Sequence, residues 1–189
     1  MEKTPESFIF MKVGNHAGET FEQILQRKNQ EKKNAGKIFW GYGGPTLHPL
    51  SQVQPFARAE KSQSGIIYIL METIESNADP DILPATHYSA DGINWEEIPE
   101  GVDVLGSRYA LIMDEIKPVD ISFHPEEFII AIGPSREKIA SEYLRGHVDK
   151  ACLTIAGSAP QATGDIKVRE ARYAAELLEP YAVLLKHDP

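Results

Sequence analysis

The chain has 189 residues, of which 42% are hydrophobic and 25% are charged, and its formal net charge is −9. These values indicate a single soluble globular domain over residues 1–189 and argue against general binding to a nucleic-acid backbone, which requires clustered Lys and Arg. The chain also shows no membrane-spanning apolar run, no secretory signal pattern and a single cysteine, Cys152, so we expect a cytoplasmic protein without an internal disulfide.

The first part of the chain predicts a strand, a helix and a second strand. Residues Ser7–Val13 are apolar on both faces, which is typical of a buried strand. Thr20 and Gln23 have the spacing of a capping box, and the helix that they begin should end at Gly36 in a left-handed cap. The apolar face of this helix is formed by Phe21, Ile24, Leu25 and Lys28. Residues Ile38–Tyr42 predict the second strand.

The next segment combines a proline-rich stretch with the most apolar run of the chain. Pro49 and Pro55 predict a turn or a short helical piece between Leu47 and Arg58, because proline interrupts a long helix. Residues Gly65–Ile74 give the strongest strand signal. Two further apolar runs predict strands at Tyr109–Ile116 and Glu127–Ile132.

A β-hairpin is predicted at residues His87–Glu96, with Asp91-Gly92 at its tip. The run Ser89-Ala90-Asp91-Gly92-Ile93-Asn94-Trp95 resembles an Asp-box, the Ser-x-Asp-Gly-x-x-Trp hairpin repeated in sialidase-like propellers. The resemblance implies that the Asp and the Ser tie the turn while Trp95 packs beneath it. A propeller needs such a hairpin in many blades, and this chain has one copy, so the resemblance implies no sialidase activity.

The C-terminal third predicts a helix from Arg136 to Leu144, capped by Ser135, and then a strand at Ala151–Ala156. With the strand before it, this order predicts one βαβ unit with a parallel crossover. The last segment fits either a helix over Ile166–Leu178, ended by Pro180, or a long bent strand. Together the elements predict an α+β fold: a single mixed domain with a largely antiparallel sheet or partly open barrel of about seven strands and two or three helices.

One candidate site is polar. His16 and Glu19 lie in the loop after the first strand, and His48 follows the bend after the second. If these strands are neighbours, both loops open at one end of the sheet, where ligand sites of open sheets lie. The three residues would suit a metal ion or an acid–base pair with an orienting carboxylate. Alternatively, Glu19 interacts with the positive end of the following helix.

The second candidate site is the bend rich in glycine and aromatic residues after the second strand. Trp40 and Tyr42 alternate with glycines, so both rings should point to one face. The amides of Gly43 and Gly44 could read the edge of a planar ligand such as a nucleobase, with Arg108 as a further contact. In the alternative interpretation the rings pack into the core, the glycines let another element approach, and Arg108 is an ordinary exposed arginine.

Two other features favour a structural interpretation. The arrangement that comes nearest to a basic cluster lies on the first predicted helix and consists of Arg27, Lys28, Lys32 and Lys33. We expect these residues to form a solvated helix face. Cys152 lies in an apolar run and is expected to be a buried core residue.

Three functions stay open from the sequence. The first is binding of a small base- or nucleotide-like ligand by the aromatic bend, and the order of elements in the first half is similar to that of PUA-type domains, which hold bases in aromatic pockets. The second is a small hydrolytic enzyme that uses His16, Glu19 and His48. The third is an accessory protein-interaction domain. The sequence identifies no cofactor.

Overall fold

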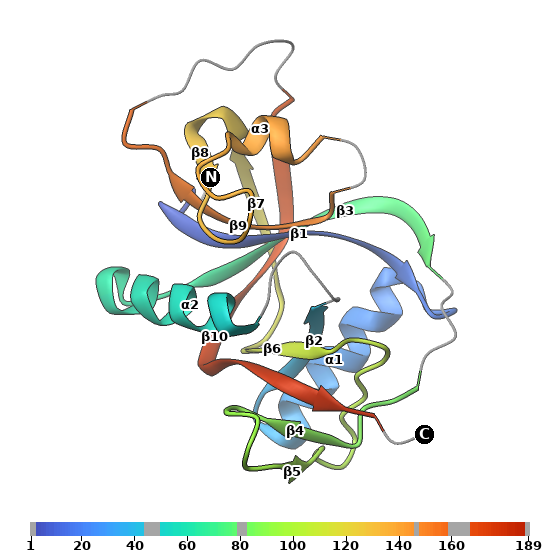
Figure 1. The fold of residues 1–189 in the computed structure, drawn as a ribbon. Coiled ribbons are helices and arrows are strands. Elements are labelled where there is room, and N and C mark those ends of the chain that lie inside the picture. The colour runs from blue at the N-terminus through green and yellow to red at the C-terminus, as the bar shows by residue number, and fades with distance from the viewer. Residues whose placement is uncertain (1–2, 44–49, 79–82, 146–147, 159–166, 188–189) are drawn as a thin grey trace.

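The structure is a computed structural model that describes residues 3–43, 50–78, 83–145, 148–158 and 167–187, and these adopt an α+β fold (Figure 1). The helices are α1 (Phe21–Ala35), α2 (Leu50–Ser64), α3 (Ala140–Tyr143) and the short 3-10 helix η1 (Pro125–Glu127). The strands are β1 (Ser7–His16), β2 (Ile38–Gly43), β3 (Tyr68–Ala78), β4 (His87–Ser89), β5 (Glu96–Glu97), β6 (Tyr109–Met113), β7 (Lys117–Phe123), β8 (Phe128–Ile130), β9 (Lys150–Ile155) and β10 (Arg169–Lys186). Of the helices in these ranges, none is long and apolar enough to cross a membrane.

The strands form one ten-stranded open sheet with the order β2-β6-β10-β3-β1-β9-β8. Strands β4 and β7 also pair with β10, and β5 pairs with β4. Strands β1 and β3 run parallel, and the other pairs among the described residues run antiparallel. The predicted α+β fold with a largely antiparallel sheet is therefore confirmed. The strands are more numerous than predicted, and the sheet does not close into a barrel.

The long strand β10 joins the two halves of the sheet, as Figure 1 shows. Its first part pairs with β7 and β3, and its last part pairs with β6 and β4. The pairing register with β6 shifts between Leu177 and Ala182, on either side of Pro180, so this segment bends without leaving the sheet. Of the two structures that the sequence allowed for this segment, the bent strand is the one observed.

The predicted βαβ unit near the C-terminus is wrong. Strands β8 and β9 pair antiparallel, with Phe128 opposite Ile155. Ser135 caps no helix, because the chain turns back on β8 after Gly133 and Ile139 bridges to Ile129. The following helix, α3, has only four residues. The parallel pair lies instead between β1 and β3, and the chain that connects them contains α1, β2 and α2.

Two further elements contain a proline, and the prediction of only a turn or a short helical piece between Leu47 and Arg58 is wrong. Helix α2 is 15 residues long with Pro55 inside it. The proline removes one main-chain hydrogen bond near the N-terminal end, and the burial of Val53, Phe56 and Ala57 compensates for this loss. Strand β7 was not predicted from the sequence, and it contains Pro118. It pairs with β10 and shows the alternating burial of a strand with one solvated face.

Helix α1 forms as predicted, because its end signals are local. The Thr20 side chain accepts a hydrogen bond from the Gln23 amide at 3.3 Å, and the Gln23 side chain accepts one from the Thr20 amide at 2.8 Å. The helix ends at Gly36 with a φ of 75°, the predicted left-handed cap.

The main hydrophobic core joins side chains of strands that are distant in the sheet order. Strands β1 and β2 are separated by β6, β10 and β3 in the sheet, yet Ile9, Trp40 and Tyr42 belong to one cluster of buried side chains. Cys152 lies in the same cluster, and burial raises the pKa of its thiol. Cys152 is therefore a core residue, as predicted.

The predicted hairpin is present, with β4 paired to β5. The Asp91 carboxylate accepts hydrogen bonds from the amides of Ile93 and Asn94 at 2.8 Å, and the Ser89 hydroxyl accepts one from the Gly92 amide at 2.9 Å. The Asp-box resemblance therefore predicted the turn correctly. Trp95, however, is 41% exposed, so it lies less fully beneath the turn than the resemblance implied.

We expect Asp91→Ala to open this turn locally while the rest of the fold stays intact. The amide hydrogens of Ile93 and Asn94 would lose their acceptor, so their exchange with solvent should accelerate, as measured by hydrogen exchange in NMR. These bonds hold the pKa of Asp91 well below its usual value. In the unsubstituted protein the turn should therefore loosen only as the pH falls below the ordinary aspartate range. Unchanged exchange in Asp91→Ala would contradict this account.

We expect Gly43→Ala to destabilise the protein by about 3 kcal/mol, because the new methyl group would meet the Tyr109 ring of the next strand. A Cβ at Gly43 would overlap the Tyr109 ring. Gly157→Ala is the matched control, since a Cβ there would meet no atom within 4 Å. Urea unfolding of both variants measures the difference. Equal stability of the two would show that Tyr109 moves aside without cost.

Candidate functional site

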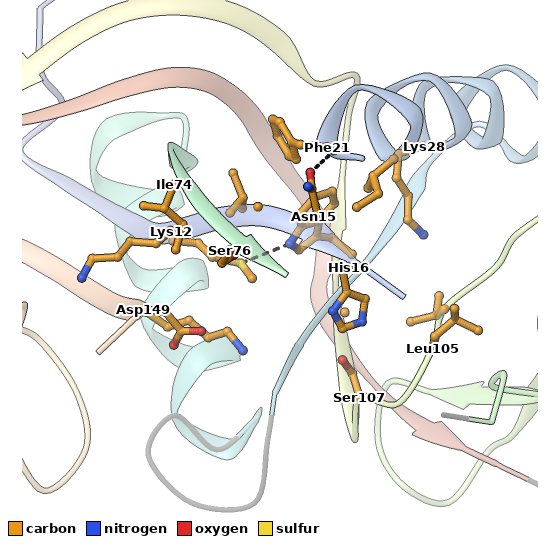
Figure 2. A pocket seen from close by; sticks show the side chains of 18 of the residues that line it. Lys12, Asn15, His16, Phe21, Lys28, Ile74, Ser76, Leu105, Ser107 and Asp149 are labelled. Carbon is orange, nitrogen blue, oxygen red and sulfur yellow. Dashed lines mark hydrogen bonds between the residues drawn. The ribbon is translucent and has the colours of Figure 1, made fainter. Parts of the chain in front are cut away.

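A cavity of about 330 Å³ opens at the C-terminal end of β1, between this strand, α1, β2 and the segment before β6 (Figure 2). Its lining includes both His16 and Trp40, which the sequence had placed in two separate candidate sites. We expected the loops that carry His16 and His48 to open at one end of the sheet if the first two strands were neighbours. These strands are not neighbours in the sheet, yet Trp40 on β2 and His16 on β1 line the same cavity.

The apolar wall of the cavity is built around Trp40. Its side chain is 6% exposed, and its indole Nε1–H points at the Met11 sulfur at 3.2 Å. Phe21 and Ile24, from the first turn of α1, extend the same wall. This wall presents an aromatic ring and a polarisable thioether to whatever occupies the cavity.

The polar end of β1 is organised by Asn15. Its side-chain oxygen accepts a hydrogen bond from the Phe21 amide at 3.1 Å, and its amide nitrogen donates to Asn77 at 3.0 Å. Asn15 therefore ties β1 to the start of α1, as Figure 2 shows, and to the end of β3. His16 follows, half-buried, and lines the cavity.

Glu19 is held by an arginine. His16 and Glu19 exchange two main-chain hydrogen bonds of 3.0 Å, which close the turn before α1. The Glu19 carboxylate accepts bonds from Arg27 Nε at 2.9 and 3.2 Å, and these bonds lower the pKa of Glu19. The carboxylate is thus the ion-pair partner of Arg27 on α1, and among the described residues no hydrogen bond joins it to the amides at the start of this helix.

The interpretation of Arg27 and Lys28 as part of a solvated helix face is wrong for Lys28. Its ammonium is buried and donates to both oxygens of Glu31, at 2.9 and 3.0 Å. It also donates to the main-chain oxygens of Phe39 on β2 and Asp103, each at 2.7 Å. Glu31 is fully buried and accepts a further bond from the Asp103 amide at 3.0 Å.

This ion pair joins three segments at one wall of the cavity: α1, β2 and the chain near residue 103. Burial lowers the pKa of Lys28 and raises that of Glu31, and the attraction between the two charges opposes both shifts. Arg27 adds a third link, since it donates to the Asp103 oxygen at 3.2 Å. Arg27 and Lys28 therefore have a structural role.

The opposite wall carries Asp149 and Lys150, which the sequence did not single out. In Figure 2, Asp149 and Lys28 lie on opposite sides of the pocket, with His16 between them. The Lys150 ammonium lies 5.4 Å from the centroid of the Tyr42 ring. Burial lowers the pKa of Lys150, and the nearby carboxylate of Asp149 only partly opposes this.

The other residues of the aromatic candidate site lie behind or beside the cavity. Tyr42 is fully buried in the core together with Trp40, so both rings do share one face as expected. The Tyr109 ring lies against the backbone of Gly43. The main-chain oxygen of Gly43 accepts a hydrogen bond from the Arg108 amide at 2.9 Å. The Arg108 side chain is exposed.

Two predicted site residues, Gly44 and His48, lie outside the described residues. Among the residues that the structure does describe, no three His, Cys, Asp or Glu side chains gather closely enough to hold a metal ion.

For Lys28, the sequence contained a signal of burial that we interpreted wrongly. Lys28 falls on the apolar face of α1, at the positions that pack inward, and a lysine there requires a buried partner. Lys150 gave no such signal. Its place beside the cavity depends on the pairing of β9 with β1, which are more than a hundred residues apart in the chain.

Comparison of the chain with family models, with curated proteins and with solved structures gives no match. The assignment of a function therefore depends on the geometry of the cavity.

We expect Glu31→Gln to destabilise the protein by about 3 kcal/mol, because it leaves the buried Lys28 ammonium without its carboxylate. Glu22→Gln, on the solvated side of the same helix, is the control and should cost less than about 1 kcal/mol. The double variant Lys28→Met/Glu31→Gln should recover part of the loss, since it removes the unpaired charge. Denaturant unfolding compares the three, and equal stability of the two single variants would contradict a structural role for the pair.

Proposed function

We propose that this protein binds a small base- or nucleotide-like ligand in the cavity lined by Trp40 and His16. The observation that carries this proposal is the position of Trp40 on the cavity wall: its ring belongs to the core, yet one part of it borders open space. The volume of about 330 Å³ lies at the lower end of the range for small-molecule pockets. An aromatic wall with a few polar groups is the usual lining of such pockets.

In this proposal the residues have different roles. The planar part of the ligand lies against Trp40 and Met11, which supply most of the apolar contact. His16 and Ser107 offer side-chain hydrogen bonds at the edge of the cavity. Tyr42 and Gly43 support the wall from behind, because Tyr42 is fully buried and a ring of the next strand covers Gly43.

We place binding ahead of the hydrolytic alternative because of the state of Glu19. Its carboxylate is bound by Arg27, so His16 would need another group to orient it. The third function, protein interaction, would use a different surface, at the hairpin where Ile93 is 80% exposed and Trp95 is 41% exposed.

The two tryptophans of this chain allow a direct test. Trp95 lies outside the cavity, so Trp95→Phe leaves Trp40 as the single fluorescent reporter. We expect the emission of Trp40 to change saturably on titration with at least one of adenine, uracil, adenosine, AMP, GMP or orotate. The same compound should raise the free energy of unfolding by about 2.7 kcal/mol at a hundredfold excess over its Kd.

The reciprocal variant, Trp40→Phe, is the control. It keeps an aromatic side chain on the wall and leaves Trp95 as the reporter, so the same titration should give no saturable change in emission. Binding in the cavity would be contradicted by an equal response of both variants. It would equally be contradicted if Trp40 emission responded to none of these compounds.

A further inference from the structure

The outer edge of β2 carries main-chain groups that no other described strand pairs. Strand β2 is the terminal strand of the sheet order, and it pairs with β6 along its other edge. The Asp114 amide donates a hydrogen bond to β10, and the direction of the main-chain groups alternates along a strand. Met113 therefore directs its main-chain groups toward Ile38, its partner on β2. By the same alternation, Phe39 and Gly41 direct theirs away from β6, toward the open edge.

Phe39 and Gly41 differ in what meets these groups. The Phe39 oxygen accepts a hydrogen bond from the Lys28 ammonium at 2.7 Å, which closes the edge at this position. Gly41 is half-buried and lines the cavity. Within the described ranges, no hydrogen bond pairs its amide or its oxygen. Because half-buried main-chain groups are costly to leave unpaired, Gly41 offers a binding position to a ligand in the cavity.

The two faces of β2 at this position are covered differently. A Cβ at Gly41 would overlap the Ser107 hydroxyl, so Ser107 lies against one face of the strand. The Trp40 ring lies on the other face, because neighbouring residues of a strand point to opposite faces. Both residues line the same cavity as Gly41. A planar ligand against Trp40 therefore has the main-chain edge of Gly41 beside it.

This edge is open over one residue, which is too short to pair with a peptide strand. The Phe39 oxygen is bonded to Lys28 on one side, and the Gly43 oxygen is bonded to the Arg108 amide on the other. Gly41 thus presents one donor and one acceptor side by side. A flat ring offers the complementary pair wherever an acceptor atom stands next to an N–H or amino group, as at the edge of a nucleobase.

We infer that Gly41 reads the edge of the ligand's base through its main chain. Its N–H donates to a ring nitrogen or carbonyl oxygen of the base, and its C=O accepts from the adjacent N–H or amino group. This inference rests on the proposed function and adds the chemical class of the ligand, a base whose donor–acceptor edge carries no substituent. It assigns to Gly41 the role that the sequence suggested for the amides of Gly43 and Gly44.

Hydrogen exchange, measured by NMR after isotope labelling of glycine, tests the donor in the unsubstituted protein. Each of the six compounds of the fluorescence titration has a donor–acceptor edge. We expect the Gly41 amide to exchange rapidly in the free protein, and about tenfold more slowly when the protein is saturated with a compound that binds at Trp40. Gly157, which is exposed and does not line the cavity, is the control and should show no change.

Methylated compounds test the acceptor. For each compound that binds, the matched probe is the analogue in which every N–H of the base is methylated, such as N6,N6-dimethyladenosine for adenosine or 1,3-dimethyluracil for uracil. We expect the methylated analogue to bind about tenfold more weakly, because the Gly41 oxygen then lacks a donor. For uracil, 1-methyluracil keeps one donor–acceptor edge and should bind like the parent compound.

Substitution then assigns the contact to the main chain at position 41. Gly41→Pro/Ser107→Gly removes the N–H, and Gly41→Ala/Ser107→Gly keeps it, while the second substitution makes room for the new Cβ in both. The N–H points off the ladder, so proline removes no bond between strands. We expect the variant with Gly41→Pro to bind about tenfold more weakly than its alanine counterpart. If it does not fold, hydrogen exchange and the methylated compounds still decide.

The outcomes separate this inference from the proposed function. Binding at Trp40 with unchanged exchange at Gly41 would overturn the inference and leave the proposed function intact. Equal binding of a compound and its fully methylated analogue would also overturn it, as would equal binding by the two double variants. Absence of a Trp40 response to all six compounds would contradict the proposed function together with the inference.

Discussion

The cavity depends on the buried ion pair between Lys28 and Glu31. A lone lysine on the inward face of an amphipathic helix would prevent α1 from packing, because an uncompensated ammonium is costly to bury. Glu31, one turn later, compensates the charge, and the two main-chain oxygens of Phe39 and Asp103 receive the remaining hydrogen bonds. These bonds have direction, unlike the apolar contacts around them. They set where α1 lies against β2 and how closely the segment near residue 103 approaches.

The proposed ligand binding needs a cavity wall that does not collapse, and the hydrogen-bond network of Lys28 and Glu31 supplies one. An apolar cavity bordered by flexible side chains tends to close, because its lining loses dispersion contacts. Here one side of the space is held by charged hydrogen bonds, and the other side is held by the ladder between β1 and β9. Trp40 spans the region between them and is fixed by Met11. The open space next to the indole ring is thus bounded by groups that cannot easily move into it.

The sequence predicted the features that depend on neighbours in the chain. The capping box of Thr20 and Gln23 and the hairpin turn of Asp91 both form within a few residues, so the spacing of these residues was sufficient to predict them. Prediction from the sequence failed where pairing between distant segments outweighs the local conformational preference of the residues. Pro55 is tolerated because of the side chains that α2 buries, and β7 was not predicted although Val119, Ile121 and Phe123 alternate with other residues along it.

The same division between local and long-range features applies to the candidate site. Trp40 and His16 were found from their residue types, and both line the cavity. Lys150 could not be found, because its side chain reaches the cavity only through the register of β9 opposite Met11. The curvature of the sheet, which brings β2 back over β1, is likewise a property of the whole set of strands and of no single segment.

The position of β10 has a consequence for the folding of the chain. This strand follows every other strand in sequence, yet it lies between β3 and β6 in the sheet. Until residues 169–186 insert, β3 and β6 each keep one open edge, and the two halves of the sheet have no shared strand. Such non-local pairing slows folding, and open strand edges favour self-association. The nascent chain therefore holds two exposed apolar strands that can pair with another copy before the central strand arrives.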